Sequence, residues 1–290
     1  MLKACYSPRY YANTHTNSME KLTAVAKVVE QKQLAQCIDP GIIEVELLKQ
    51  LHRPAYVEAF LAGKQPEASI QGFRDWNPQL RDAVLSINAG QLLGAELAMK
   101  EGIAANIAQG FHHASYEAGA AYCTFNGLAL IAKYYPKKTI FILDCDQHGG
   151  DGTAQFTTKL PNLINFGIFG IRFGCRANSR NFTRYIHPKQ GNFEQYLEAL
   201  HESFEMIERF QADLIVYQAG MDCHQKDKYG SKWFTTELLY QRDQAVFKMA
   251  KQKGIPILFV LAGGYQPLEE LVPLHVNTFI AADVTYFSDH

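Results

Sequence analysis

A surplus of charge is absent from this sequence, which has 28 Lys and Arg residues against 29 Asp and Glu residues and a formal net charge of −1. Such a balance gives no global basic field to hold nucleic acid or an anionic membrane, and we expect neither as a partner. No apolar run approaches the length of a bilayer-spanning helix. The first residues lack the apolar core of a secretory signal. We therefore expect a cytoplasmic protein.

Paired cysteines and linkers are also absent. The six cysteines form no Cys-x-x-Cys motif and are scattered through a chain long enough to fold without disulfide bonds, so we expect reduced thiols. No internal repeat, low-complexity tract or Pro/Ser-rich linker interrupts the 290 residues. This even composition favours a single domain over residues 1–290.

Short apolar runs alternate with amphipathic stretches along the chain. The runs are bounded by Gly, Pro, Asp or Lys and predict buried strands at 103–108, 139–144, 213–218 and 255–261. Apolar residues at spacings of three and four predict helices, and the candidate segments are 17–34, 125–134, 193–210 and 237–253. The alternation predicts an α/β fold with a mainly parallel sheet covered by helices on both faces. Apart from the strand at 103–108, residues 35–110 are harder to assign, and 64–80 are predicted to be a loop.

Residues able to carry chemistry follow each of the four predicted strands. They are His112 and His113, then Asp144, Asp146, His148 and Asp151, then Asp222, and finally Gly263, Gly264 and Tyr265. Each has an ordinary explanation alone, such as a helix cap, a surface histidine pair or a turn. Ligands of parallel sheets bind beyond the carboxyl ends of the strands, so a coincidence at four strand ends favours one site. Carboxylate oxygen and imidazole nitrogen are normal zinc ligands, and Asp146 and His148 can point to the same side of an extended segment.

Taken together, these motifs resemble the zinc-dependent histone deacetylase family over about residues 85–270. The resemblance is carried by Gly110-Phe111-His112-His113-Ala114, by Cys123 and Asn126, by the segment Asp144 to Gly152, by Ala219 to Asp222 with Asp227, and by Gly263-Gly264-Tyr265. Tyr6-Ser7-Pro8-Arg9-Tyr10, Gln147 and Gly263 to Gln266 are most similar to the class IV branch and its bacterial relatives.

The resemblance implies an arginase/deacetylase-type fold and a role for each motif residue. Asp146, His148 and Asp222 would bind one Zn²⁺ per chain. His112 and His113 would flank the reacting water, with Asp144 and Asp151 as their carboxylate partners, and Tyr265 would face the substrate carbonyl. Because two of the ligands are anionic, we expect a weakly acidic zinc that depends on a neighbouring base. His113 is our candidate base, and His112 is expected to stay charged.

The implied reaction is removal of an acetyl or longer acyl group from the side-chain amine of lysine in a protein or peptide. A small acylated amine such as an acetylpolyamine is the alternative substrate, which acidic residues at the mouth would favour; Glu117 alone does not decide. A non-catalytic acyl-lysine binder ranks lowest, because no ligand and no tyrosine of the motif set is lost.

Several positions depart from the family pattern. Ala120-Ala121-Tyr122 precede Cys123, where the family usually has Gly-Gly-Phe or Ser-Gly-Phe. We expect substrate contacts from Ala121, Tyr122, Phe173 and Gly264, with the acyl-chain preference left open by the first two.

Metal binding beyond one zinc is less supported. A two-metal site like that of arginase would need carboxylates where this chain has Gly150 and His224, so a mononuclear site is predicted. A structural K⁺ near Asp144 stays an open alternative, because the expected contributor, Gly167, has no side-chain oxygen. Surface positions are predicted for His187 and His224.

Overall fold

The computed structural model describes residues 1–288, and in this range eight strands form one sheet in which every neighbouring pair is parallel. The strand order is β2-β1-β3-β8-β7-β4-β5-β6. The strands are β1 (Leu2–Cys5), β2 (Ala35–Ile38), β3 (Ile103–Gln109), β4 (Ile140–Asp144), β5 (Leu163–Phe169), β6 (Asn181–Tyr185), β7 (Leu214–Ala219) and β8 (Ile257–Leu261). The predicted parallel α/β architecture is confirmed.

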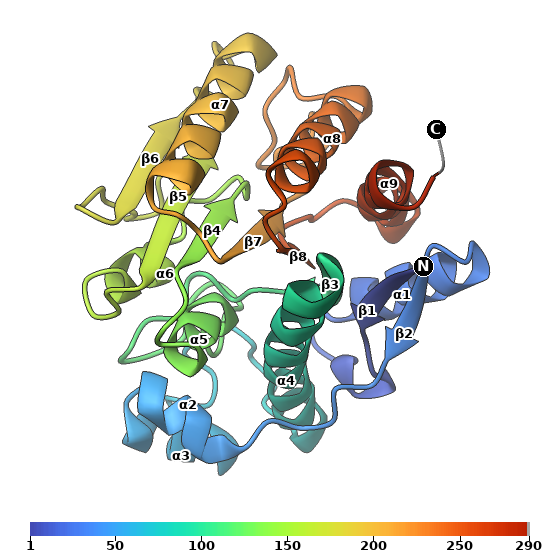
Figure 1. Cartoon of the computed structure of the whole chain (residues 1–290). Helices are drawn as coiled ribbons and strands as arrows, with labels where there is room; N and C mark the ends of the chain where they lie inside the picture. The colour runs from blue at the N-terminus through green and yellow to red at the C-terminus, as the bar shows by residue number, and fades with distance from the viewer. Residues whose placement is uncertain (289–290) are drawn as a thin grey trace.

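Helices cover both faces of this sheet (Figure 1). In the view of Figure 1, α7 (Phe193–Arg209), α8 (Thr236–Lys253) and α9 (Leu268–Tyr286) lie above the sheet, while α4 (Pro78–Glu101) and α5 (Gly127–Tyr134) lie below it. The remaining helices are α1 (Glu20–Gln31), α2 (Val45–Leu51), α3 (Pro54–Leu61), α6 (Asp151–Phe156) and the short 3-10 helix η1 (Pro8–Tyr10). None of the helices within residues 1–288 is both long and apolar enough to span a membrane.

The predicted elements correspond to β3, β4, β7, β8, α1, α5, α7 and α8, each within a few residues of its predicted bounds. The loop prediction for 64–80 is wrong at its end, because α4 begins at Pro78. Asn77 caps this helix by accepting a hydrogen bond from the Leu80 N–H at 2.9 Å, and Pro78 occupies the first helical position. The helix is buried on more than one side, which removes the amphipathic pattern that would reveal it in the sequence.

The strand order decides where the predicted site residues lie. Strands β3, β8, β7, β4 and β5 are consecutive neighbours in the middle of the sheet. Because all are parallel, their carboxyl ends lie along the same edge. Four of these ends carry the motif residues, and the fifth, β5, leads to the segment that contains Phe173.

Candidate active site

The carboxyl ends of β4 and β7 bring three buried side chains together. Asp146, His148 and Asp222 are 4%, 8% and 0% exposed. Each offers one donor atom, and these atoms all lie within 4.8 Å of one another. The His148 Nδ1 lies 2.9 Å from Asp222 Oδ2 and 3.3 Å from Asp146 Oδ1. The three predicted zinc ligands therefore form one cluster.

Backbone N–H groups hold both carboxylates of this cluster in place. The Gln147 N–H donates to Asp222 Oδ1 at 2.9 Å, and the His148 N–H donates to Asp146 Oδ1 at 2.9 Å. From the end of β8, the Gly263 N–H donates to Asp146 Oδ2 at 2.7 Å. Three N–H donors, from the ends of β4 and β8, thus fix the carboxylates before any cation binds.

The donor set and its electrostatics fit a metal cation. Burial and the charge of Asp146 raise the pKa of Asp222 to about 7. Burial alone would lower the pKa of His148, but its hydrogen bonds to Asp146 and Asp222 outweigh it and raise this pKa to about 11. Two carboxylates buried side by side are stabilised by a positive charge between them. One imidazole nitrogen with two carboxylate oxygens is a normal donor set for zinc.

A second metal cluster is not found among residues 1–288, where this is the one group of its kind.

The prediction of a surface position for His224 is wrong. His224 is 3% exposed, its Nε2 lies 3.1 Å from Thr236 Oγ1, and its Nδ1 lies 3.0 Å from Gln266 Nε2. It packs the segment after β7 against α8 and the segment after β8. His187 is partly buried, and its Nδ1 accepts backbone N–H groups of the next loop.

The two histidines after β3 lie beside the cluster, each paired with the expected carboxylate. His112 Nδ1 is 2.7 Å from Asp144 Oδ2, and His113 Nδ1 is 2.7 Å from Asp151 Oδ1. Burial would lower the pKa of His112, but Asp144 and Asp146 outweigh it and raise it to about 9. Burial and the neighbouring His112 cation lower the pKa of His113 to about 4, despite Asp151. The pair is therefore split into one charged ring and one neutral ring at pH 7.

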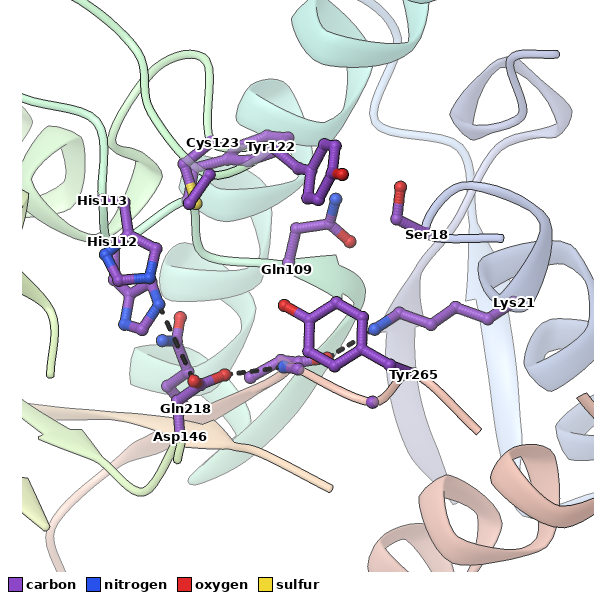
Figure 2. A pocket seen from close by; sticks show the side chains of 15 residues that line it. Ser18, Lys21, Gln109, His112, His113, Tyr122, Cys123, Asp146, Gln218 and Tyr265 are labelled. Carbon is purple, nitrogen blue, oxygen red and sulfur yellow. Dashed lines mark hydrogen bonds and ion pairs between the residues drawn. The ribbon is translucent and has the colours of Figure 1, made fainter. Parts of the chain in front are cut away.

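Tyr265 faces this cluster from the segment after β8, and its hydroxyl points into the pocket (Figure 2). Burial and the charges of Asp222 and Asp146 raise its pKa well above the ordinary value, so the hydroxyl stays protonated and can donate. Asp227 fixes the backbone here, because its Oδ2 accepts the Tyr265 N–H at 2.7 Å and its Oδ1 accepts the Tyr229 N–H at 3.0 Å.

Lys21 is a pocket residue that none of the sequence motifs contains. An inner cavity of about 40 Å³ is lined by Lys21, Gln109, Gln218, Asp146 and Tyr265, among others (Figure 2). Lys21 is 3% exposed, and its Nζ donates to the Ala262 carbonyl at 2.5 Å. Burial lowers its pKa to about 8, opposed by Asp222 and Asp146. A lysine in helix α1 carries no sequence signal, because lysine is common on helix surfaces.

An outer cavity of about 250 Å³ shares walls with the inner one and reaches the surface. Ala121, Tyr122 and Phe173 line it, whereas Gly264 lines only the inner cavity. The Phe173 ring is 43% exposed, and its centroid lies 4.2 Å from that of His113. Ala121, Tyr122 and Phe173 have positive φ values of 45°, 64° and 46°, a region that disfavours residues with a Cβ. The four predicted substrate contacts thus lie on the two cavities.

A buried ion pair supports the segment after β7 from behind. Arg242 on α8 is 0% exposed, and its Nη1 donates to the Gly220 carbonyl at 2.7 Å. Its Nε donates to Asp243 Oδ1 at 2.9 Å. Asp243 also accepts the Tyr217 hydroxyl at 2.5 Å and the Thr278 hydroxyl at 2.6 Å. The network therefore joins β7, α8 and α9 next to Asp222.

Comparison with known proteins shows which family this chain belongs to. Residues 15–279 match the histone deacetylase domain. An uncharacterised protein of Picosynechococcus sp. is 29% identical over 267 residues, covering 89% of this chain and 88% of that protein. Histone deacetylase 2 of Arabidopsis thaliana is 29% identical over 187 residues, covering 61% of this chain and 48% of that protein. The crystal structure of acetylpolyamine aminohydrolase from Burkholderia pseudomallei matches with a TM-score of 0.80 at 14% identity, covering 98% of this chain and 99% of that one. The chain therefore belongs to the histone deacetylase family.

Proposed function

We propose that this protein is a zinc-dependent amidohydrolase that removes an acyl group from the side-chain amine of lysine in a protein or peptide. The observation that carries the proposal is the buried cluster of Asp146, His148 and Asp222 with a charged and a neutral histidine at its side. Zinc held by this cluster supplies a Lewis acid for the acyl carbonyl and makes water a better nucleophile.

The chain's own residues then handle protons and charge. His113 Nδ1 is engaged by Asp151 at 2.7 Å, which leaves Nε2 to accept a proton from the attacking water and return it to the leaving amine. Its low pKa keeps this nitrogen unprotonated at neutral pH. His112 remains a cation held by Asp144 and stabilises the negative charge that develops on the carbonyl oxygen. The Tyr265 hydroxyl donates to the same oxygen, a contribution worth about 10²–10³ in rate for one such donor.

An acylated polyamine is the second candidate substrate. It is suggested by the name of the acetylpolyamine aminohydrolase whose fold this chain shares. Its cleavage would use the same reaction chemistry but would need a different entrance to the outer cavity. Peptidyl lysine is placed first because, within residues 1–288, no carboxylate lines the outer cavity to hold a second ammonium group.

A substrate panel tests the proposal. Peptides carrying acetyl, longer acyl or lactyl groups on lysine, together with acetylpolyamines, are assayed with and without chelator. We expect chelator-sensitive hydrolysis of at least one acyl-lysine peptide and about one zinc per chain. His148→Ala should lose zinc, whereas Lys248→Ala, an exposed change on α8, should keep it. A zinc-loaded protein that hydrolyses none of the panel would contradict the proposal, and a zinc ratio near two would contradict a mononuclear site.

A further inference from the structure

Two of the segments that line the outer cavity are rich in positive charge. Residues 170–180 connect β5 to β6 and supply Ile171 and Phe173 to the cavity wall, while residues 220–235 connect β7 to α8 and supply Lys228 and Tyr229. Their basic residues are Arg172, Arg176, Arg180, Lys226, Lys228 and Lys232. Because the whole chain has a net charge of −1, this cluster is a local surplus.

No free acidic side chain balances these residues within the same two segments. Their acids are Asp222, which belongs to the candidate metal cluster, and Asp227, which is 6% exposed and bonded to two backbone N–H groups. Lys226 pairs with Glu270 at 3.3 Å. Among residues 1–288, neither Arg172 nor Lys228 forms an ion pair, and both are exposed. The positive charges of Arg172 and Lys228 are therefore available to interact with a negatively charged substrate.

Lys228 is the cation placed most directly at the opening. Its Nζ lies 4.8 Å from the Tyr229 ring centroid and 5.2 Å from the Tyr265 ring centroid, so it stands over both aromatic rings at the cavity wall. Cation–π contacts of this kind limit where a flexible lysine side chain points. On the other segment, Arg172 is exposed and lies in the sequence between Ile171 and Phe173, which both line the cavity.

We propose that this basic rim, defined as Arg172 and Lys228, selects acyl-lysine peptides with acidic residues next to the acylated lysine. The proposal rests on the proposed function. A carboxylate on the residue next to the acyl-lysine would be attracted by the positive charge of the rim. An acylated polyamine keeps its other amines protonated at neutral pH, because alkyl ammonium groups titrate near pH 10, and meets repulsion at the same place.

Matched peptides test this selection. One acetyl-lysine sequence is made with Glu, Gln or Lys on both sides, and kcat/KM is measured beside acetylspermidine at low and high salt. From exposed charge pairs we expect Glu flanks to exceed Lys flanks by about tenfold at low salt, with the ratio shrinking at high salt. Lys228→Glu should remove or reverse the preference. Lys248→Glu, the same charge change on the remote surface of α8, should keep it.

The outcomes separate the two proposals. If Glu-flanked and Lys-flanked peptides are hydrolysed at equal rates, or if Lys228→Glu leaves the preference unchanged, the basic rim does not select substrates. The proposal that the protein is a deacylase is not affected by either result. Faster turnover of acetylspermidine than of the Glu-flanked peptide also overturns it. Dissociation constants of the same peptides, measured by fluorescence anisotropy, test the rim if no peptide is hydrolysed: tighter binding of the Glu-flanked peptide supports it, and equal binding rejects it.

Discussion

Gly263 offers the sharpest test of the candidate metal site, because its Cα faces both ligand carboxylates. A Cβ added here would lie 2.2 Å from Asp222 Oδ2 and 2.7 Å from Asp146 Oδ2. Carbon and oxygen atoms that are not bonded need about 3.3 Å. In Gly263→Ala, at least one carboxylate must therefore move by roughly 1 Å, or the backbone that donates to Asp146 must withdraw.

The expected loss follows from that displacement. Disturbing the groups that orient metal ligands costs about 10- to 100-fold in metal affinity. A misplacement of about 1 Å at a reacting centre costs about 10²-fold in rate. We therefore expect Gly263→Ala to bind zinc about 10- to 100-fold more weakly and, at limiting zinc, to lose about 10²-fold in kcat/KM.

Competition with a chromophoric chelator measures the zinc affinity, and thermal denaturation of the metal-free protein reports whether the variant folds. Gly167→Ala on β5 is the matched control, because its Cβ would meet only the Phe169 ring, at 3.4 Å, and the Asn165 side chain, at 4.0 Å. The control should keep wild-type zinc affinity. Wild-type affinity and activity in Gly263→Ala would refute this reasoning about the carboxylates.

Four further changes have defined outcomes. Tyr265→Phe should lower kcat by about 10²–10³ while zinc content stays constant; wild-type turnover would remove the hydroxyl from the reaction. Because the pKa of His113 is lowered to about 4, kcat/KM should rise with pH along an acid limb below pH 6.5, and a limb above pH 7 would exclude this base. Arg242→Leu should cost about 3–5 kcal/mol in urea unfolding, whereas Arg184→Leu, which breaks an exposed pair, should cost under about 1 kcal/mol; equal losses would contradict the role of burial. Ala121→Gly relieves a positive φ of 45°, so destabilisation by more than about 1 kcal/mol would contradict strain at this position.

The sequence predicted four of the five central strands and the helices α1, α5, α7 and α8 because their signals are local, but it did not predict β5 or the long helices α4 and α9. Strands β3, β4, β7 and β8 are buried along nearly their whole length and read as continuous apolar runs. The short strands β1, β2 and β6 lie toward the sheet edges and give no such run. Helix α4 was missed because burial on several sides removes its amphipathic pattern.

The sequence by itself also determined which residues follow the strand ends, and with them the identity of the candidate site. That was enough because parallel strands place those residues at one edge whatever the details of packing. Only the tertiary structure decided the rest. Lys21 enters the inner cavity through a contact with Ala262, 241 positions away, and His224 became buried through partners on two other segments. The basic rim is likewise made by two segments that only the sheet order brings together. Contacts of this kind depend on how distant segments pack, and no local pattern of residues encodes that.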